Sequence, residues 1–229
     1  MIRKLPVWVW FGGVLLTLSA GLINSVALLS YANQAVTHVT GSISLSSVAM
    51  SQGNWSGVGH LSAVVVFFFL GSVLSGAITR GSQLRKGRRY GVAMLLESFL
   101  LLCSMMLFTH SSLWGQLIAS LACGLQNGMV TTFSGAIIRT THMTGIVTDL
   151  GNKIGLWLTG GEMDLRRFCL YQLLLSGFIS GGIIGALSFE TMGYYTLLIP
   201  AVITGAGGLA YMIHVIKLRK KRESIEVTG

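Results

Sequence analysis

The sequence predicts an all-α fold: a polytopic transmembrane helix bundle of six spans, made of two inverted three-span repeats plus short re-entrant or interfacial helices. Three observations lead to this fold class, namely the composition, the length of the apolar runs and the positions of the basic residues. Only 10% of the 229 residues are charged, whereas soluble domains carry about 25%. The chain cannot cover a water-facing surface of ordinary composition. This excludes a soluble enzyme, a secreted disulfide scaffold and a disordered chain.

Six apolar runs have the length of about 20 residues that crosses a hydrocarbon core. They are Val7–Ser30, Leu61–Thr79, Tyr90–Phe108, Leu113–Ser134, Leu170–Phe189 and Tyr194–Ile216. The first run follows Arg3 and Lys4, as the apolar region of a signal peptide would. However, it is longer than such a region, and no clear small-residue cleavage site follows it. We therefore expect it to be retained as a span.

All 16 Lys and Arg residues lie on one side of the membrane when these six spans are threaded with the N-terminus inside. They occur within residues 3–4, 80–89, 139–167 and 217–222. Because basic residues accumulate on the cytoplasmic side, the sequence predicts both termini inside. It also predicts a single transmembrane domain over residues 1–216, with repeats at about 7–109 and 110–216, and a basic cytoplasmic tail over 217–229.

The positive-inside rule also indicates whether two moderately apolar stretches cross the membrane, namely Val36–Met50 and Thr140–Leu158. If the first stretch crossed the membrane, the basic cluster at 80–89 would move outside. It would still be outside if both stretches crossed. Neither is expected to cross fully. We predict short helices or re-entrant elements, one entered from outside and the other from inside.

The internal repeat is visible in two pairs of sequence blocks. Gly21–Asn24 recurs as Gly124–Asn127, and Thr37–Gly41 recurs as Thr141–Gly145, at offsets of 103 and 104 residues. A less specific block of small residues recurs after 109 residues. Because each repeat holds an odd number of spans, the second copy must be inverted. Inverted repeats are typical of secondary transporters and also occur in some channels.

The six-span layout with paired Gly-Leu-x-Asn and Thr-His-x-Thr-Gly blocks resembles the YoaK-like family of bacterial inner-membrane proteins, a domain-of-unknown-function family. The resemblance extends over roughly residues 5–220. It implies a multi-pass protein of the bacterial cell inner membrane, for which the basic residues predict cytoplasmic N- and C-termini. The resemblance implies no established activity and contributes neither a substrate nor a site residue.

Glu97 is the one carboxylate deep inside a predicted span. An acid at that depth costs about 2.5–3.5 kcal/mol on insertion scales, and intramembrane ionisable residues are functional candidates for this reason. We predict Glu97 as a proton- or cation-coupling group. The alternative is a protonated side chain that only hydrogen-bonds a neighbouring helix. The second repeat has no acid at the corresponding depth.

The paired blocks supply the other candidate residues, which we predict to line a substrate path. They are Asn24, His38, Thr40, Gln126, Asn127, His142 and Thr144. An amide next to glycine is typical of a locally unwound span that faces a substrate. Alternatively, the amides form interhelical hydrogen bonds, while Thr37 or Thr141 caps a short helix and the histidines rest at the headgroups.

Other features are read as structural. Asp149 and Lys153, four residues apart, are expected to pair on a short inside helix. Two motif histidines do not make a metal site, because no third ligand has suitable spacing, and no motif for a nucleotide or other cofactor is present. Membrane lipids and a small-molecule or ion substrate are the expected partners. Nucleic acid is not, because no basic face interleaved with aromatic residues is present.

A secondary transporter of a small solute, coupled to protons through Glu97, is the leading prediction. A channel for a small neutral or anionic solute remains an alternative within transport. A membrane-embedded enzyme acting on a lipid or quinone is the alternative from another class, with Glu97 and a histidine as acid and base. That chemistry needs the two groups within about 3 Å, directly or through one water. The sequence does not identify the substrate.

Overall fold

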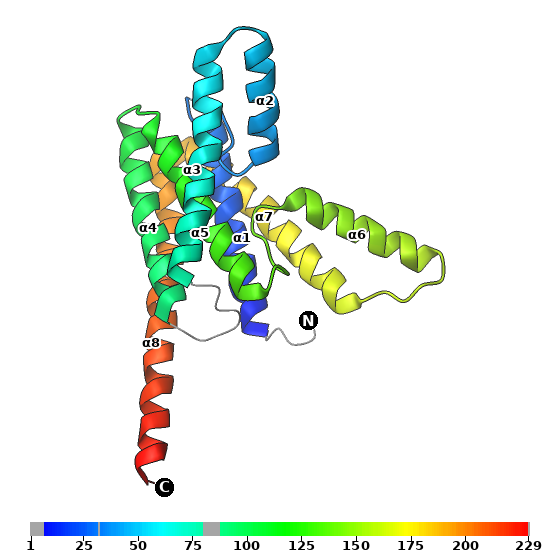
Figure 1. Ribbon diagram of the computed structural model, residues 1–229, viewed down its shortest axis with the longest axis vertical. Coiled ribbons are helices and arrows are strands. Elements are labelled where there is room, and N and C mark those ends of the chain that lie inside the picture. The colour runs from blue at the N-terminus through cyan, green and yellow to red at the C-terminus, as the bar shows by residue number, and fades with distance from the viewer. Residues whose placement is uncertain (1–6, 32, 80–87, 229) are drawn as a thin grey trace.

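The computed structural model describes residues 7–31, 33–79 and 88–228, and within them every regular element is helical (Figure 1). The helices are α1 (Val7–Leu29), α2 (Val39–Ser51), α3 (Trp55–Thr79), α4 (Arg88–Thr109), α5 (Trp114–Ser134), α6 (Met143–Leu158), α7 (Leu165–Met192) and α8 (Leu198–Thr228), with a 3₁₀ turn, η2 (Gly193–Leu197), between the last two. The predicted all-α fold is confirmed. Several basic residues that fixed the predicted orientation lie outside the described residues: Arg3, Lys4, Arg80, Arg85 and Lys86.

Four helical segments of the described chain are long and apolar enough to cross a membrane: Trp8–Leu29, Trp55–Thr79, Arg88–Thr109 and Leu165–Lys217. The last is 53 residues long and contains the final two predicted spans. It reverses direction at η2, where Gly193 has a φ of 55° (Figure 1). These apolar helices are compatible with a multi-pass membrane protein. The predicted arrangement of six spans in inverted repeats is more specific than what these four segments show.

The predicted span Leu113–Ser134 forms α5 but is not one of the four apolar segments. The reason is its position in the fold. Thirteen of its 21 residues are buried, Gln116, Ser120 and Gln126 among them, and it packs against α3, α4 and α1. A helix enclosed by other helices can carry polar side chains that a lipid-facing helix cannot.

The bundle rests on three main helix pairs: α1 with α7, α3 with α5, and α4 with α8. The first two pairs are parallel and held close by glycine. Along α7, Gly177, Gly181 and Gly185 meet α1 at positions 14, 18 and 22, in the same order. Small residues let helix backbones approach in this way, which gives van der Waals packing that does not depend on water.

The contacts of the two parallel pairs correspond to each other. Gly21 of α1 meets the carbonyl of residue 178, and Gly124 of α5 meets that of residue 68. In the same way, Gly181 meets the carbonyl of residue 18, and Gly71 meets that of residue 121. Adding 103 to the residue numbers in α1 gives the matching residues of α5, and subtracting 110 from those in α7 gives the matching residues of α3.

The α4–α8 pair is antiparallel and corresponds to itself. Gly91 packs against Gly208, and seven residues further along α4 the Ser98 hydroxyl donates to the carbonyl of Ala201 at 2.7 Å. Adding 110 to the numbers of Gly91 and Ser98 gives 201 and 208, so each of the two contacts maps onto the other. Figure 1 shows the resulting alternation: α1, α4 and α7 run upward in that view, and α3, α5 and α8 run downward.

The two stretches between predicted spans form α2 and α6, which lie outside the main bundle (Figure 1). Among the helices, α2 packs along α3 and α6 packs along α7. The chain that precedes α2 turns back into the bundle. There the carbonyl of Gln34 accepts from the Gln116 side chain at 2.7 Å, and the carbonyl of Val36 accepts from Ser120 at 3.4 Å. The segment before α2 therefore packs against α5 inside the bundle, whereas α2 itself is peripheral.

Candidate functional site

Glu97 lies at the centre of the bundle, one position from the Ser98 contact between α4 and α8. The side chain is fully buried, and neither carboxylate oxygen has a hydrogen-bond partner. Gln126 and Cys123 of α5 lie within interaction range of the carboxyl group. The Gln126 side chain is likewise fully buried; it interacts with the Glu97 carboxyl group but forms no close hydrogen bond. The structure thus brings two of the predicted residues, Glu97 and Gln126, into one unsatisfied polar centre.

Buried polar groups without partners are expensive. Each costs about 1–3 kcal/mol, and charged groups cost more. Since more than nine-tenths of buried polar groups find a partner, the clustering of four orphaned atoms on Glu97 and Gln126 needs a reason. A closer approach of the two side chains would satisfy part of this centre, and a bound proton, a bound solute or a second arrangement of the helices would satisfy the remaining atoms.

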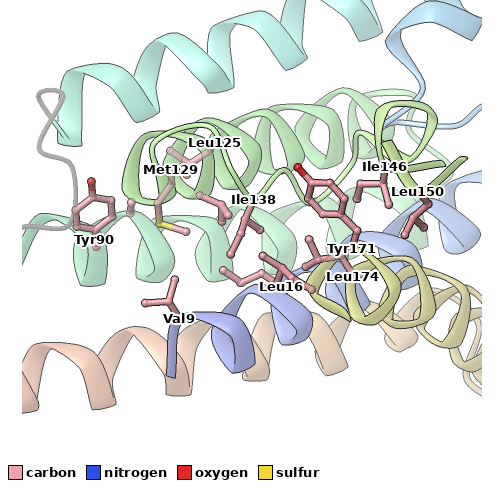
Figure 2. Close-up of a cluster of buried hydrophobic side chains, with 13 residues drawn as sticks. Val9, Leu16, Tyr90, Leu125, Met129, Ile138, Ile146, Leu150, Tyr171 and Leu174 are labelled. Atoms are coloured by element: carbon pink, nitrogen blue, oxygen red, sulfur yellow. The ribbon is translucent and has the colours of Figure 1, made fainter. Parts of the chain in front are cut away.

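An apolar cavity of about 480 Å³ approaches this centre from one end of the bundle. It opens between α1, α4, α5 and α8, near the start of α1 and the end of α5. Figure 2 shows Val9, Tyr90 and Met129, which line it, within one buried cluster. Met94, another lining residue, precedes Glu97 by three positions, and Met129 follows Gln126 by three. The polar centre therefore lies one helical turn beyond the inner wall of the cavity.

Asn24 is not among the residues that line the apolar cavity. It fastens the segment before α2 to α1: its Oδ1 accepts from the Thr37 hydroxyl at 2.8 Å and from the Thr37 backbone N–H at 3.3 Å. Asn24 and Thr37 are both buried. Asn24 lies five residues before the end of α1, about 7.5 Å along the helix axis. We refer to this pair as the Asn24–Thr37 latch.

The corresponding latch in the second half is not formed. Asn127 is the counterpart of Asn24, but its buried Oδ1 has no hydrogen-bond partner. The hydroxyl of Thr140, next to the counterpart of Thr37, is fully buried and also without a partner. The two halves match in their glycine contacts but differ at this pair of polar residues.

The motif histidines occupy matching positions but are remote from the polar centre. His38 and His142 are the N-cap residues of α2 and α6, with nearly the same backbone conformation: φ −93° and ψ 65° for His38, φ −92° and ψ 58° for His142. Neither side chain caps its helix, and both histidines are exposed, as are Thr40 and Thr144. Since Glu97 has no hydrogen-bond partner, no histidine is paired with it directly.

Two further polar features escaped the sequence reasoning. His60 donates from Nε2 to the Gln116 side chain at 2.7 Å, which joins α3 to α5. On the other half, Arg139, Asp149 and Tyr171 line a second cavity together with His142. The expected Asp149–Lys153 pair is replaced by a contact of Asp149 with the Tyr171 hydroxyl. A search for charged residues in the matching repeat positions would have singled out Arg139 and Asp149.

Comparisons with known proteins agree with the sequence resemblance. Residues 12–210 match the profile of a family described as "Protein of unknown function (DUF1275)". No curated protein and no solved structure matches the chain significantly. The matched region holds the bundle helices, the polar centre and both cavities apart from their outermost residues.

Proposed function

The chain belongs to the DUF1275 family of proteins of unknown function, and from this premise we propose that it is a secondary transporter of a small solute. In this proposal two inverted repeats expose the Glu97–Gln126 centre to the two sides of the membrane in turn. Glu97 carries the coupling proton. The protein crosses the bacterial inner membrane six times, with both termini in the cytoplasm.

The correspondence of helix contacts supports the inverted repeat. The same sequence shifts convert the contacts of the parallel α1–α7 pair into those of the parallel α3–α5 pair. They convert the contacts of the antiparallel α4–α8 pair into one another. A two-fold axis through the α4–α8 crossing, in the plane of the membrane, relates contacts in this manner. Inverted repeats of transporters have this symmetry, and their substrate sites lie near it. Glu97 adjoins the crossing.

The difference between the two latches is the observation that carries the proposal. The Asn24–Thr37 latch is closed at one end, while at the other end Asn127 is unpaired and the apolar cavity opens. A symmetric scaffold with one latch closed and one open is what alternating access requires. The basic residues assign the open end to the cytoplasm. We therefore interpret this conformation as inward-facing.

The same observation favours a carrier over a channel, because the apolar cavity enters from one end of the bundle and stops one helical turn short of the polar centre. The enzyme alternative receives less support. Its acid–base pair needs Glu97 and a histidine in hydrogen-bond reach or bridged by one water, whereas the motif histidines are exposed and Glu97 is enclosed.

We expect Glu97→Gln to abolish proton-coupled uptake, because glutamine keeps the shape of the side chain and removes the proton site. Proteoliposomes loaded with a pH indicator would be challenged with a panel of amino acids, organic acids and organic cations under an imposed pH gradient. Wild-type protein is expected to show solute-dependent proton flux, and Glu97→Gln to show flux at the level of empty liposomes.

The matched control is Glu190→Gln, which removes an exposed carboxylate at the end of α7. It is expected to transport like the wild type. If Glu97→Gln retains full proton coupling, Glu97 has no part in the mechanism. If no solute of the panel elicits saturable uptake or exchange in the wild type, the transporter proposal fails.

A further inference from the structure

A second cavity, of about 420 Å³, lies where α6 and α7 meet the segment that follows α5. Its volume is in the range of about 300–1,000 Å³ that is typical of small-molecule sites. Its polar lining residues come from three parts of the chain and are Arg139, His142, Thr144, Thr148, Asp149 and Tyr171. Ile137 and Ile146 provide an apolar wall. The site is separate from the apolar cavity beneath Glu97.

The cavity has a cationic side and an anionic side. The Arg139 guanidinium donates to Nδ1 of His142 at 3.1 Å, and the first turn of α6 adds backbone N–H groups without intrahelical partners. Asp149 instead contacts the Tyr171 hydroxyl, and no ion pair joins Asp149 to Arg139. Two opposite charges thus line one cavity without an ion pair between them, and Arg167 of α7, which is not a lining residue, also acts on Tyr171.

The matching half of the protein lacks these groups. At the repeat offsets, Arg139 corresponds to Ala35, Asp149 to Leu45 and Tyr171 to Leu61. A polar group needed for the fold of the repeat would be expected in both copies, since both build the same helix pairs. The positive-inside rule accounts for an arginine on the cytoplasmic side but not for the acid or the tyrosine. The charged lining is therefore specific to this one cavity.

We propose that this cavity binds a zwitterionic group, with a carboxylate or phosphate beside Arg139 and an ammonium beside Asp149. The Tyr171 hydroxyl and the threonine hydroxyls of α6 supply further hydrogen bonds. A free amino acid carries this chemistry, and so does the headgroup of an ethanolamine phospholipid. The proposal does not depend on transport, because it concerns ligand binding in this cavity alone.

The test measures ligand binding to the purified full chain in a neutral detergent, by calorimetry and by thermal shift. The probes are L-alanine and O-phosphoethanolamine, with acetate and methylammonium as the two halves of the charge pair. The zwitterions are expected to bind saturably, and each half to bind at least about tenfold more weakly, since one charge-assisted hydrogen bond contributes about 1.5–3 kcal/mol.

Arg139→Gln and Asp149→Asn are each expected to lower zwitterion affinity about tenfold or more. Both residues are exposed, so the ligand-free melting temperature is expected to stay at the wild-type value. Arg88→Gln is the control: Arg88 is exposed, and it is not part of the cavity lining. It is expected to bind like the wild type.

Native mass spectrometry with ethanolamine and glycerol phospholipids separates the two sources of the ligand. Selective retention of the ethanolamine lipid, lost in Arg139→Gln, assigns the site to a headgroup, and binding of the soluble zwitterions alone assigns it to a solute. The proposal is overturned if neither class binds saturably. It is also overturned if acetate binds as well as alanine, or if Arg139→Gln binds like the wild type.

Discussion

Replacing Gly124 by alanine is expected to destabilise the protein by about 1–3 kcal/mol, the usual cost of an overpacked contact. A Cβ at this position of α5 would collide with the backbone carbonyl of Phe68 in α3. A carbonyl cannot rotate away as a side chain can, so the two helices would have to separate. The free energy of unfolding, measured by titration with a denaturing detergent in mixed micelles, reports the loss.

Gly76→Ala is the matched control for this prediction. Gly76 also lies in a span helix, but a Cβ there meets no heavy atom within 4 Å. Alanine in a helix is favoured over glycine by about 1 kcal/mol, so Gly76→Ala is expected to be neutral or stabilising. Gly21→Ala, which would strike the Phe178 carbonyl, is expected to match Gly124→Ala. Equal stability of Gly124→Ala and Gly76→Ala would refute the close α3–α5 packing.

Asn24→Ala is expected to open the outer side of the protein. The change leaves the Thr37 hydroxyl and N–H without their acceptor, at a cost of about 1–3 kcal/mol for buried donors. This cost falls only on the state in which the latch is closed, so the population moves toward the other state about tenfold per 1.4 kcal/mol. A cysteine introduced at the buried position Ala35, in protein lacking its native cysteines, would report the shift as faster labelling from outside.

Asn127→Ala separates this prediction from a general loss of stability. Its Oδ1 has no partner in the conformation described, so labelling at position 35 is expected to stay slow. In the proposed alternating-access cycle, transport is nevertheless expected to fall, because Asn127 can no longer form the counterpart of the Asn24–Thr37 latch. Thr37→Val keeps the backbone N–H of residue 37 and removes only the hydroxyl, so an intermediate labelling rate is expected. Equal labelling rates in wild type and Asn24→Ala would refute the latch.

The sequence was sufficient to predict the helical fold because a membrane span is specified by length and polarity within one continuous run. Glu97 was predictable for the same reason, since a carboxylate inside such a run is costly wherever its neighbours lie. The proximity of Glu97 to Gln126 was not predictable, because it depends on which face of α4 packs against α5. That orientation comes from helix packing, which leaves little trace in composition.

The latch and the second cavity depend on contacts between separate segments. Asn24 and Thr37 were both noted, but their hydrogen bonds require the chain after α1 to turn back into the bundle. Tyr171 lies in an apolar run and gives no local sign of its contact with Asp149. Conversely, His38 and His142 lie in a repeated motif, yet the structure leaves their side chains exposed. Repetition indicated an equivalent backbone position rather than a shared site.

Accessibility of two loop positions tests the inverted topology most directly. In protein lacking Cys103, Cys123 and Cys169, single cysteines would replace Gln52, at the turn between α2 and α3, and Glu162, between α6 and α7; both positions are exposed. An impermeant maleimide added to intact cells is expected to label position 52, and position 162 only after the membrane is opened. Labelling of both positions from the same side would contradict inverted halves, and alternating access about Glu97 with them.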